Sequence, residues 1–402
     1  MGRMRETASF YRPLAPLFGA IFCCMLGVGA SLAVLPFLVR DDLGADTVTV
    51  GVVIGAIAVA AVLTRPVAGR LADRHGYRRV MLVGAVTSAL AGAVYLLGES
   101  SVPLLMTARI LHGVGEGAVY TAGAAWLVSL CPPQRRGRVV GLYGIHMWLG
   151  ITIGALLGTV ALRVGGYPTV WLFCVVGSLL GMALVAVPPA PARVAATSRA
   201  ALFPTSALTP GIALALAGLG YAALAAFVGL HMAERGVANG IAAFNAFGFT
   251  YIGVRLVLGN VPDRLGARRV AIWSAGVEAV GLLLVAIAPN LAVAIVGGLV
   301  TGAGLSLLFP SLALLVINRT EPANQGAALG MFTSFWDVGL VVGGPLAGLV
   351  AGLAGYPAAF VVTLGCALAA GLLAAAGIRS TPRATPQPVT GSTPASACAD
   401  PG

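Results

Sequence analysis

Three ionisable side chains of one apolar segment have the types and the spacing that proton transfer requires. The segment, ARILHGVGEGAVY at residues 108–120, contains Arg109, His112 and Glu116. Positions i, i+3 and i+7 of a helix fall within a sector of about 60°, so the three side chains share one face. Because desolvation favours the neutral form of a buried carboxyl group, Glu116 could bind a proton in one conformation and release it in another. The competing interpretation is a permanent ion pair between Arg109 and Glu116 that never titrates.

A further acid lies within another apolar segment, SFWDVGLVVGGP at residues 334–345. Ionisable groups in such segments cost about 2.5–3.5 kcal/mol on insertion scales, so something must compensate them. Asp337 is therefore a candidate for a second proton or cation site. The alternative is a hydrogen-bonded group at an interface between two parts of the chain.

The chain that positions these groups is strongly apolar: 58% of its 402 residues are hydrophobic and its mean hydropathy is +0.96. Both values lie outside the range of soluble proteins. Apolar stretches of about 20 residues, enough for a helix to cross roughly 30 Å of hydrocarbon, recur along nearly the whole sequence. We predict an all-α integral membrane protein with twelve transmembrane helices, at residues 17–39, 48–68, 79–98, 102–129, 138–162, 167–187, 208–231, 239–260, 269–288, 290–317, 326–352 and 357–377.

Basic residues set the predicted orientation, because arginines collect on the cytoplasmic side of membrane proteins. With the N-terminus inside, Arg40, Arg163 and Arg235 fall in outer loops and Arg109 within a span, and we assign all other arginines to cytoplasmic segments. We therefore expect a multi-pass protein of the inner (plasma) membrane with both termini cytoplasmic. The net charge of +11 then comes from arginines beside the lipid bilayer, which we expect as the partner, and we expect no binding of nucleic acid. The six cysteines show no CxxC spacing, so we expect no metal site.

The sequence repeats itself at half its length. GRLADRHGYRR at residues 69–79 returns as GNVPDRLGARR at 259–269, and GGYP at 165–168 returns as AGYP at 354–357. Such repeats indicate two six-helix halves in parallel order, with a ligand site between them near the membrane midplane. The predicted organisation is a cytoplasmic N-terminus at 1–16, an N-terminal half at 17–187, a cytoplasmic linker at 188–207, a C-terminal half at 208–378 and a disordered cytoplasmic tail at 379–402.

The duplicated motif resembles the cytoplasmic loop motif of the major facilitator superfamily, G-x-x-x-D-R-x-G-R-R in outline, and the resemblance covers essentially residues 15–378. The matching residues are Gly69, Asp73, Arg74, Gly76, Arg78 and Arg79 in the first copy and Asp263, Arg264, Arg268 and Arg269 in the second. The resemblance implies the twelve-helix fold of that family, and a loop that latches the two halves together when the outer side is open. The two glycines would permit close approach and tight turning of the backbone. Alternatively, the arginines are topological anchors only.

The segment around Arg109 resembles a second motif of the family, R-x-x-q-G-x-g, in which the arginine is implicated in proton coupling. His112 stands where glutamine is usual, and Glu116 stands where a small residue is usual. We therefore assign proton coupling to Glu116, Arg109, Asp337 and His112. The family's ninth span lies outside the central cavity, so we expect Glu278 to be structural.

Glycines in the predicted fifth span resemble the antiporter signature of the drug-efflux branch, G-x8-G-x3-G-P-x2-G-G. The sequence keeps four of its glycines but has Ala155 for the proline and Thr159 for the last glycine. Small residues at this spacing also let helices pack closely, which explains the pattern without reference to export. The four glycines are Gly141, Gly150, Gly154 and Gly158.

The polar content of the spans suits an apolar ligand. An unpaired buried hydroxyl costs about 1–3 kcal/mol, so a sugar site needs many amide partners. Here every glutamine falls in a loop or the tail, and Asn245 is the one asparagine well inside a predicted span. Aromatic side chains are available instead, although many of them would serve equally well as core or lipid-facing residues. The predicted cavity residues are Phe22, Tyr120, Trp126, Tyr221, Asn245, Phe309 and Trp336.

These observations favour a proton-coupled exporter of amphipathic or lipophilic drug-like small molecules that works by alternating access. We expect a monomer whose partners are the small-molecule substrate and protons, with the proton gradient as energy source and no cofactor. The close alternative is a proton-coupled uptake symporter for a small nutrient. A membrane-embedded enzyme is the third reading, but no HExxH, nucleophile elbow or phosphate-binding glycine loop supports it. We therefore expect no enzymatic activity.

Overall fold

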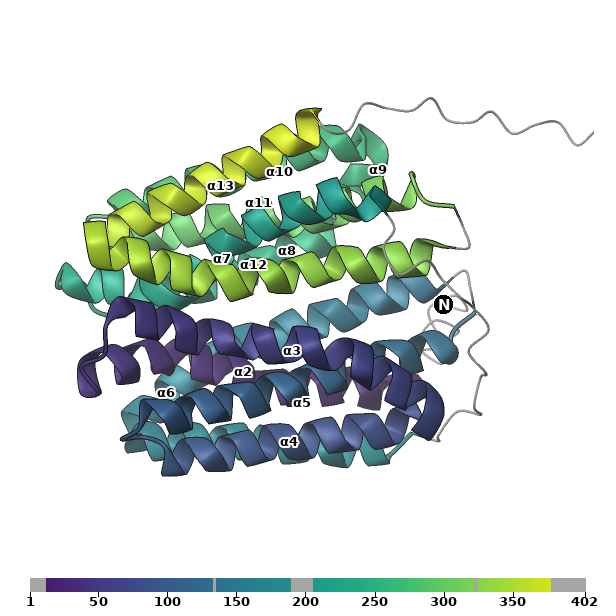
Figure 1. The fold of residues 1–402 in the computed structure, drawn as a ribbon, viewed down its shortest axis with the longest axis horizontal. Helices are drawn as coiled ribbons and strands as arrows, with labels where there is room; N and C mark the ends of the chain where they lie inside the picture. Colours follow the sequence, from purple (N-terminus) through teal and green to yellow (C-terminus); the bar gives the residue numbers. More distant parts are fainter. Residues whose placement is uncertain (1–11, 133–134, 189–204, 322–323, 377–402) are drawn as a thin grey trace, which may run out of the picture.

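The computed structural model describes residues 12–132, 135–188, 205–321 and 324–376, and these residues form helices and connections without any strand (Figure 1). The first half contains α2 (Ala15–Phe37), α3 (Thr47–His75), α4 (Tyr77–Leu97), α5 (Val102–Ser129) and α6 (Arg136–Ala186). The second half contains α7 (Leu208–Glu234), α8 (Ala242–Leu258), α9 (Val261–Leu265), α10 (Ala267–Ile287), α11 (Leu291–Ile317), α12 (Gln325–Ala354) and α13 (Tyr356–Ala376). The short turns η1 (Arg12–Leu14), η2 (Leu38–Asp42) and η4 (Thr205–Ala207) precede or follow these helices.

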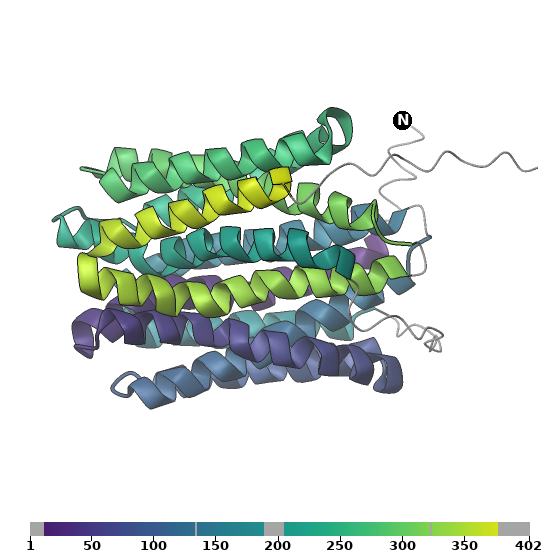
Figure 2. The same ribbon diagram turned by 45° about the horizontal axis from the view of Figure 1, so that its top comes forward.

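The helices run roughly parallel to one long axis, and Figure 2 shows the same bundle from a second direction. Nine helices of the described residues are long and apolar enough to cross a membrane. One of them, α6, is a pair of spans, and α5 and the shorter α8 bring the spans to twelve. The predicted all-helical fold class is confirmed. Most of the predicted linker and tail, and residues 1–11 of the predicted N-terminus, lie outside the described residues.

The boundary inside α6 coincides with the predicted break between the fifth and sixth spans. Gly165 and Gly166 leave helical geometry, Gly166 with a φ of 70°, and Pro168 follows within the next turn. Proline lacks the N–H that would continue the hydrogen-bond ladder, so a new helix begins there. The corresponding break in the second half is at Gly355, whose φ is 81°.

The second span extends beyond its predicted end at residue 68 and includes the first copy of the duplicated motif as far as His75. Nothing in RLADRH breaks a helix, and the chain turns only at Gly76, whose φ of 94° favours glycine. Its repeat partner Gly266 turns in the same way, with a φ of 91°. The close approach predicted for Gly69 is wrong, because the nearest atom to a β-carbon there would be Thr121 Cγ2 at 3.9 Å, an ordinary contact.

Glycines hold α6 against α2. A β-carbon on Gly150 would lie 2.5 Å from the carbonyl oxygen of Phe22, and one on Gly158 would lie 2.6 Å from Ala30 Cα. A β-carbon on Gly154 would overlap the Leu26 carbonyl oxygen. The packing role predicted for these three glycines fits the structure. For Gly141 it is wrong, because among the described residues no atom of another helix lies within 4 Å of its β position.

The two ends of the bundle differ in how the halves meet. We name the end with Gly76 and Gly266 the motif end, and the end with Thr47 and Gly348 the closed end. At the closed end, Thr47 Oγ1 donates a 2.7 Å hydrogen bond to the Gly348 carbonyl oxygen. A β-carbon on Gly51 of α3 would overlap the carbonyl oxygen of Gly344 on α12. Helices α3 and α12 are therefore in backbone contact across the interface between the halves.

The beginning of α3 at the closed end is fixed by a side-chain cap. Asp46 accepts a 2.7 Å hydrogen bond from the backbone N–H of Thr49. This bond and a second one from the Thr49 side chain favour the carboxylate and hold the pKa of Asp46 below its usual value. The cap satisfies one of the free N–H groups of the first helical turn.

Candidate functional site

A cavity of about 150 Å³ lies between the two halves. Most of its wall is apolar, and aromatic side chains come from both halves. Helices α2, α3, α5 and α6 contribute on one side, and α7, α8, α11 and α12 contribute on the other. Three charged side chains of its wall, Arg65, Glu116 and Asp337, meet in one cluster, which we name the ion cluster.

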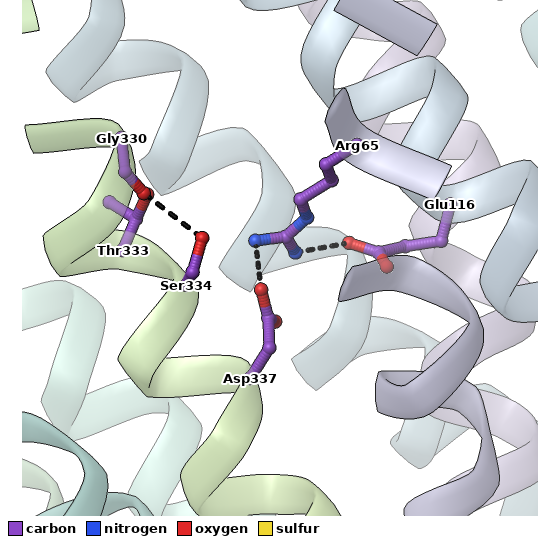
Figure 3. Close-up of polar contacts among 6 residues, drawn as sticks. All are labelled: Arg65, Glu116, Gly330, Thr333, Ser334 and Asp337. Carbon is purple, nitrogen blue, oxygen red and sulfur yellow. Dashed lines mark hydrogen bonds and ion pairs between the residues drawn. The ribbon is translucent and has the colours of Figure 1, made fainter. Parts of the chain in front are cut away.

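The ion cluster joins the two halves through one arginine (Figure 3). Arg65 Nη1 donates to Asp337 Oδ2 at 2.5 Å, and its Nη2 donates to Glu116 Oε1 at 3.3 Å. The side chains of Arg65, Glu116 and Asp337 are 21%, 12% and 4% exposed. Arg65 and Glu116 belong to α3 and α5 of the first half, and Asp337 belongs to α12 of the second. The planar guanidinium presents its donors as a fork, which suits it to bridge two carboxylates.

Further contacts lie beside Arg65 and Asp337 of the ion cluster. The guanidinium carbon of Arg65 lies 5.2 Å from the centre of the Tyr120 ring, within cation–π distance. One turn before Asp337, the Thr333 and Ser334 hydroxyls donate to the Gly330 carbonyl oxygen at 2.8 and 3.1 Å, as Figure 3 shows. These hydroxyl protons are satisfied within α12, which leaves Asp337 to the arginine.

The charges of the ion cluster do not balance. One guanidinium faces two carboxyl groups, so the cluster carries one net negative charge when both acids are ionised, and binding one proton neutralises it. A second cation of the cavity wall, Arg255, lies apart from the cluster. It donates to Tyr251 Oη at 3.1 Å, and its guanidinium carbon lies 5.3 Å from the centre of the Phe309 ring. The cavity thus combines a cluster of two acids and one arginine with a separate cation.

The ion pair between Arg109 and Glu116, which was the alternative to a titrating Glu116, is wrong, because Glu116 pairs with Arg65. Arg109 is fully buried, and its three donor nitrogens point to other helices. Nε donates to the Val53 carbonyl oxygen at 3.1 Å and Nη2 to the Ile54 carbonyl oxygen at 2.7 Å, while Nη1 donates to Ser31 Oγ at 3.1 Å. A helical carbonyl has a second lone pair available, so α3 can accept these bonds without losing its own ladder. Arg109 therefore ties α5 to α2 and α3.

His112 is not brought to the ion cluster either. It is fully buried and contacts the Tyr95 ring edge-on at a centroid distance of 6.2 Å. Within the part of the chain that the structure describes, neither ring nitrogen has a hydrogen-bond partner. Glu278 is also fully buried, and a β-carbon on Gly220 of α7 would lie 2.9 Å from its Oε1. Glu278 does not line the cavity, which agrees with the position expected for the ninth span.

Four of the seven predicted cavity residues line the cavity: Tyr120, Tyr221, Phe309 and Trp336. The other three do not. Trp126 is fully buried within the first half, Asn245 is buried at 8% exposure, and Phe22 lies where α2 meets α6. Their helices were predicted correctly, but a span number does not tell which face of the span reaches the cavity.

Sequence reasoning missed the residue at the centre of the aromatic wall. The Trp148 ring lies 4.4 Å from Tyr251, 5.3 Å from Tyr221 and 6.1 Å from Trp336, measured between centroids. A signal was present, because Trp148 occupies the position in the first half that Asp337 occupies in the second. Repeat-related positions face the same axis, so both reach the cavity.

Arginines of the duplicated motif cap the last helix of each half. Arg78 Nη2 donates to the Ala186 carbonyl oxygen at 2.5 Å at the end of α6, and its repeat partner Arg268 donates to the Ala375 carbonyl oxygen at the end of α13. These bonds satisfy terminal carbonyls that have no helical partner. The expected latch belongs to the state with the outer side open, so it stays a prediction for Asp73, Arg74, Arg79, Asp263, Arg264 and Arg269.

Comparison with known proteins identifies the family. The sequence model of the Major Facilitator Superfamily matches residues 17–237 and 210–398. The chain belongs to this superfamily. A curated relative from Burkholderia mallei (strain SAVP1), described as an uncharacterized MFS-type transporter, is 35% identical over 366 residues, which is 89% of this chain and 88% of the relative. One from Salmonella typhimurium (strain LT2) with the same description is 32% identical over 361 residues, covering 87% and 92%.

Solved structures share the fold at low sequence identity. The nucleoside transporter NupG, as its D323A mutant, has a TM-score of 0.74 at 15% identity over 92% of this chain and 100% of its own. The human organic anion transporter MFSD10 has a TM-score of 0.69 at 19% identity over 91% and 99%. These identities support the fold alone. The superfamily membership establishes a transporter, and neither substrate nor direction follows from it.

Proposed function

We propose that this transporter exports amphipathic or lipophilic drug-like small molecules in exchange for protons, with the ion cluster as the proton site. The observation that carries the proposal is Arg65 held between Glu116 of the first half and Asp337 of the second. An alternating-access transporter moves its two halves against each other, so a charged link between them must change when the cavity changes sides. Binding of a proton to either carboxyl group changes the strength of that link.

The state of the structure fits one step of this cycle. The halves are in backbone contact at the closed end, and the arginine and both acids of the ion cluster belong to the cavity wall. We infer that this is the state that opens toward the motif end, and that the motif end is cytoplasmic, with both termini on that side of the inner membrane. A substrate would then enter the cavity from the cytoplasm while the ion cluster loses its proton.

The cavity wall supports the substrate class. Tyr221, Tyr251, Trp148 and Trp336 form a broad aromatic surface, which suits planar apolar ligands and offers faces to a cation. Protonation of the ion cluster would leave Arg255 as an unbalanced positive charge on the cavity. Proton binding would therefore disfavour a bound cation, as exchange of the two requires.

The experiment measures efflux of ethidium, a lipophilic aromatic cation, from cells that express the wild type, Glu116→Gln or Glu321→Gln at several external pH values. Glu321 is an exposed acid outside the cavity and serves as the matched control. We expect wild-type efflux to accelerate as the external pH falls, because the proton gradient grows. Glu116→Gln should lose this acceleration, and Glu321→Gln should keep it. Equal efflux by all three at every pH would exclude Glu116 from coupling.

The same cells test the direction. Proton-coupled uptake would appear as ethidium accumulation that rises with external acidity in expressing cells above that in empty cells. That outcome would show uptake together with protons instead of export. The role of Glu116 would then be judged from the pH dependence of uptake in Glu116→Gln.

A further inference from the structure

A second hollow, of about 520 Å³, lies on the second half at the motif end, between α8, α9, α10 and α11. We name it the α9 groove. It shares no lining residue with the central cavity, so it is a separate site. The proposed proton site and substrate site do not include any of its residues.

The wall of the α9 groove is apolar and open to the outside of the bundle. Leu258 is 43% exposed, Leu265 is 63% exposed and Trp273 is 76% exposed. Leu258 is the last residue of α8, Leu265 is the last residue of α9, which connects α8 to α10, and Trp273 lies about two turns into α10. An exposed apolar wall on helices that cross the membrane faces the hydrocarbon chains of lipids, and the Trp273 ring adds a large apolar surface to it.

Two cations complete the α9 groove. Arg264 and Arg269 line it, and apart from Ser274 the remaining lining residues are apolar. Both arginines are exposed, and neither side chain makes a hydrogen bond or an ion pair with the described residues. The neighbouring Arg268 is engaged with the Ala375 carbonyl oxygen, and Asp263 makes no ion pair with either groove arginine within 4.0 Å. The groove thus presents two unpaired cations at the rim of an apolar wall.

We propose that the α9 groove binds an anionic phospholipid. Arg264 and Arg269 bind the phosphate of its headgroup, an acyl chain lies along the apolar wall, and the Trp273 ring packs against that chain. Basic residues beside membrane helices attract anionic lipids in this manner. A free phosphate ion would satisfy the arginines but leave the apolar wall uncovered, and a zwitterionic lipid would cover the wall but leave net positive charge. The anionic phospholipid satisfies both parts of the groove.

The test measures lipid binding to the purified full-length protein in detergent, by native mass spectrometry and by the shift in melting temperature. Four probes are compared: phosphatidylglycerol, phosphatidylcholine with the same acyl chains, glycerophosphoglycerol without chains, and inorganic phosphate. We expect phosphatidylglycerol to bind most tightly and to raise the melting temperature, and the two chainless anions to have no effect at the same concentration. The double variant R264A/R269A should bind phosphatidylglycerol at least about tenfold more weakly.

The matched control is R74A/R79A, which removes the same two charges from the first copy of the motif. It should bind phosphatidylglycerol like the wild type, because Val83 replaces Trp273 in that copy. The proposal is overturned by equal binding of the two lipids, by a phosphate effect as large as that of the lipid, or by equal losses in both double variants. If R264A/R269A does not fold, the binding of phosphatidylglycerol, phosphatidylcholine and the chainless anions to the wild type still tests the proposal.

Discussion

Arg65 is the residue on which both acids of the cavity depend. Replacement by glutamine would leave two carboxyl groups with no counter-charge between them. Removing one partner of a buried charge pair costs about 3–5 kcal/mol, and the 21% exposure of the Arg65 side chain favours the lower end. We expect Arg65→Gln to lower the melting temperature of the purified protein and, because the charged link between the halves is lost, to abolish the pH dependence of the proposed exchange.

Two variants separate this effect from a general loss of charge. Arg70→Gln removes an exposed arginine from the same helix and should leave both readouts unchanged. Arg65→Lys keeps the charge but replaces the fork by a point charge, so it should restore part of the stability. Wild-type pH dependence in Arg65→Gln would show that the arginine only anchors α3.

The helical period predicts which residues share a face of one helix, but it does not predict which atoms of other helices they contact. The period placed Arg109 and Glu116 on one helix correctly, but it could not show that Arg109 finds closer acceptors on α3. Arg65 was overlooked for a different reason: it lies within the predicted second span, yet it was assigned with the cytoplasmic arginines as a topological anchor. Arg255 on α8 was misassigned in the same way. A stricter count of charges within spans would have found both.

At the scale of elements, the α2–α6 contact offers a matched pair of glycines on one helix. A side chain on Gly154 would overlap the Leu26 carbonyl oxygen, whereas Gly141 has open space at its β position. We expect Gly154→Ala to lower the unfolding free energy by about 1–3 kcal/mol, because α2 and α6 must move apart. Gly141→Ala should instead raise it by about 0.5–1 kcal/mol, because alanine is the better helix former. Equal melting temperatures for the two variants would contradict the packing.

Helix ends could be predicted where the sequence contains residues that break helices. The fourth span was placed correctly at both ends, and the break near Gly165 was expected from GGYP. The extension of α3 to His75 was not expected, because a cluster of charges was read as a loop although it contains no helix breaker. Which face of each span reaches a neighbour depends on contacts between helices, and the sequence of one span does not contain them.

At the scale of the whole molecule, alternating access requires the closed end to open, and the closed end can be locked to test this. A β-carbon on Gly352 would lie 2.9 Å from Thr47 Oγ1, so cysteines at these two positions are close enough for a disulfide. In a background without the six native cysteines, T47C/G352C should lose transport on oxidation in proportion to the cross-linked fraction and regain it on reduction. Each single-cysteine variant should be insensitive to the oxidant.

This cross-link tests the architecture independently of the ion cluster. The two halves contact each other through glycines at the closed end, and glycine interfaces can separate without breaking charged contacts there. The charged link lies deeper, at Arg65 and Asp337, so a proton can alter it while the closed end is still shut. Full transport by completely cross-linked protein would mean that the closed end never opens, and the exchange of protons for substrate across the membrane would then need another route.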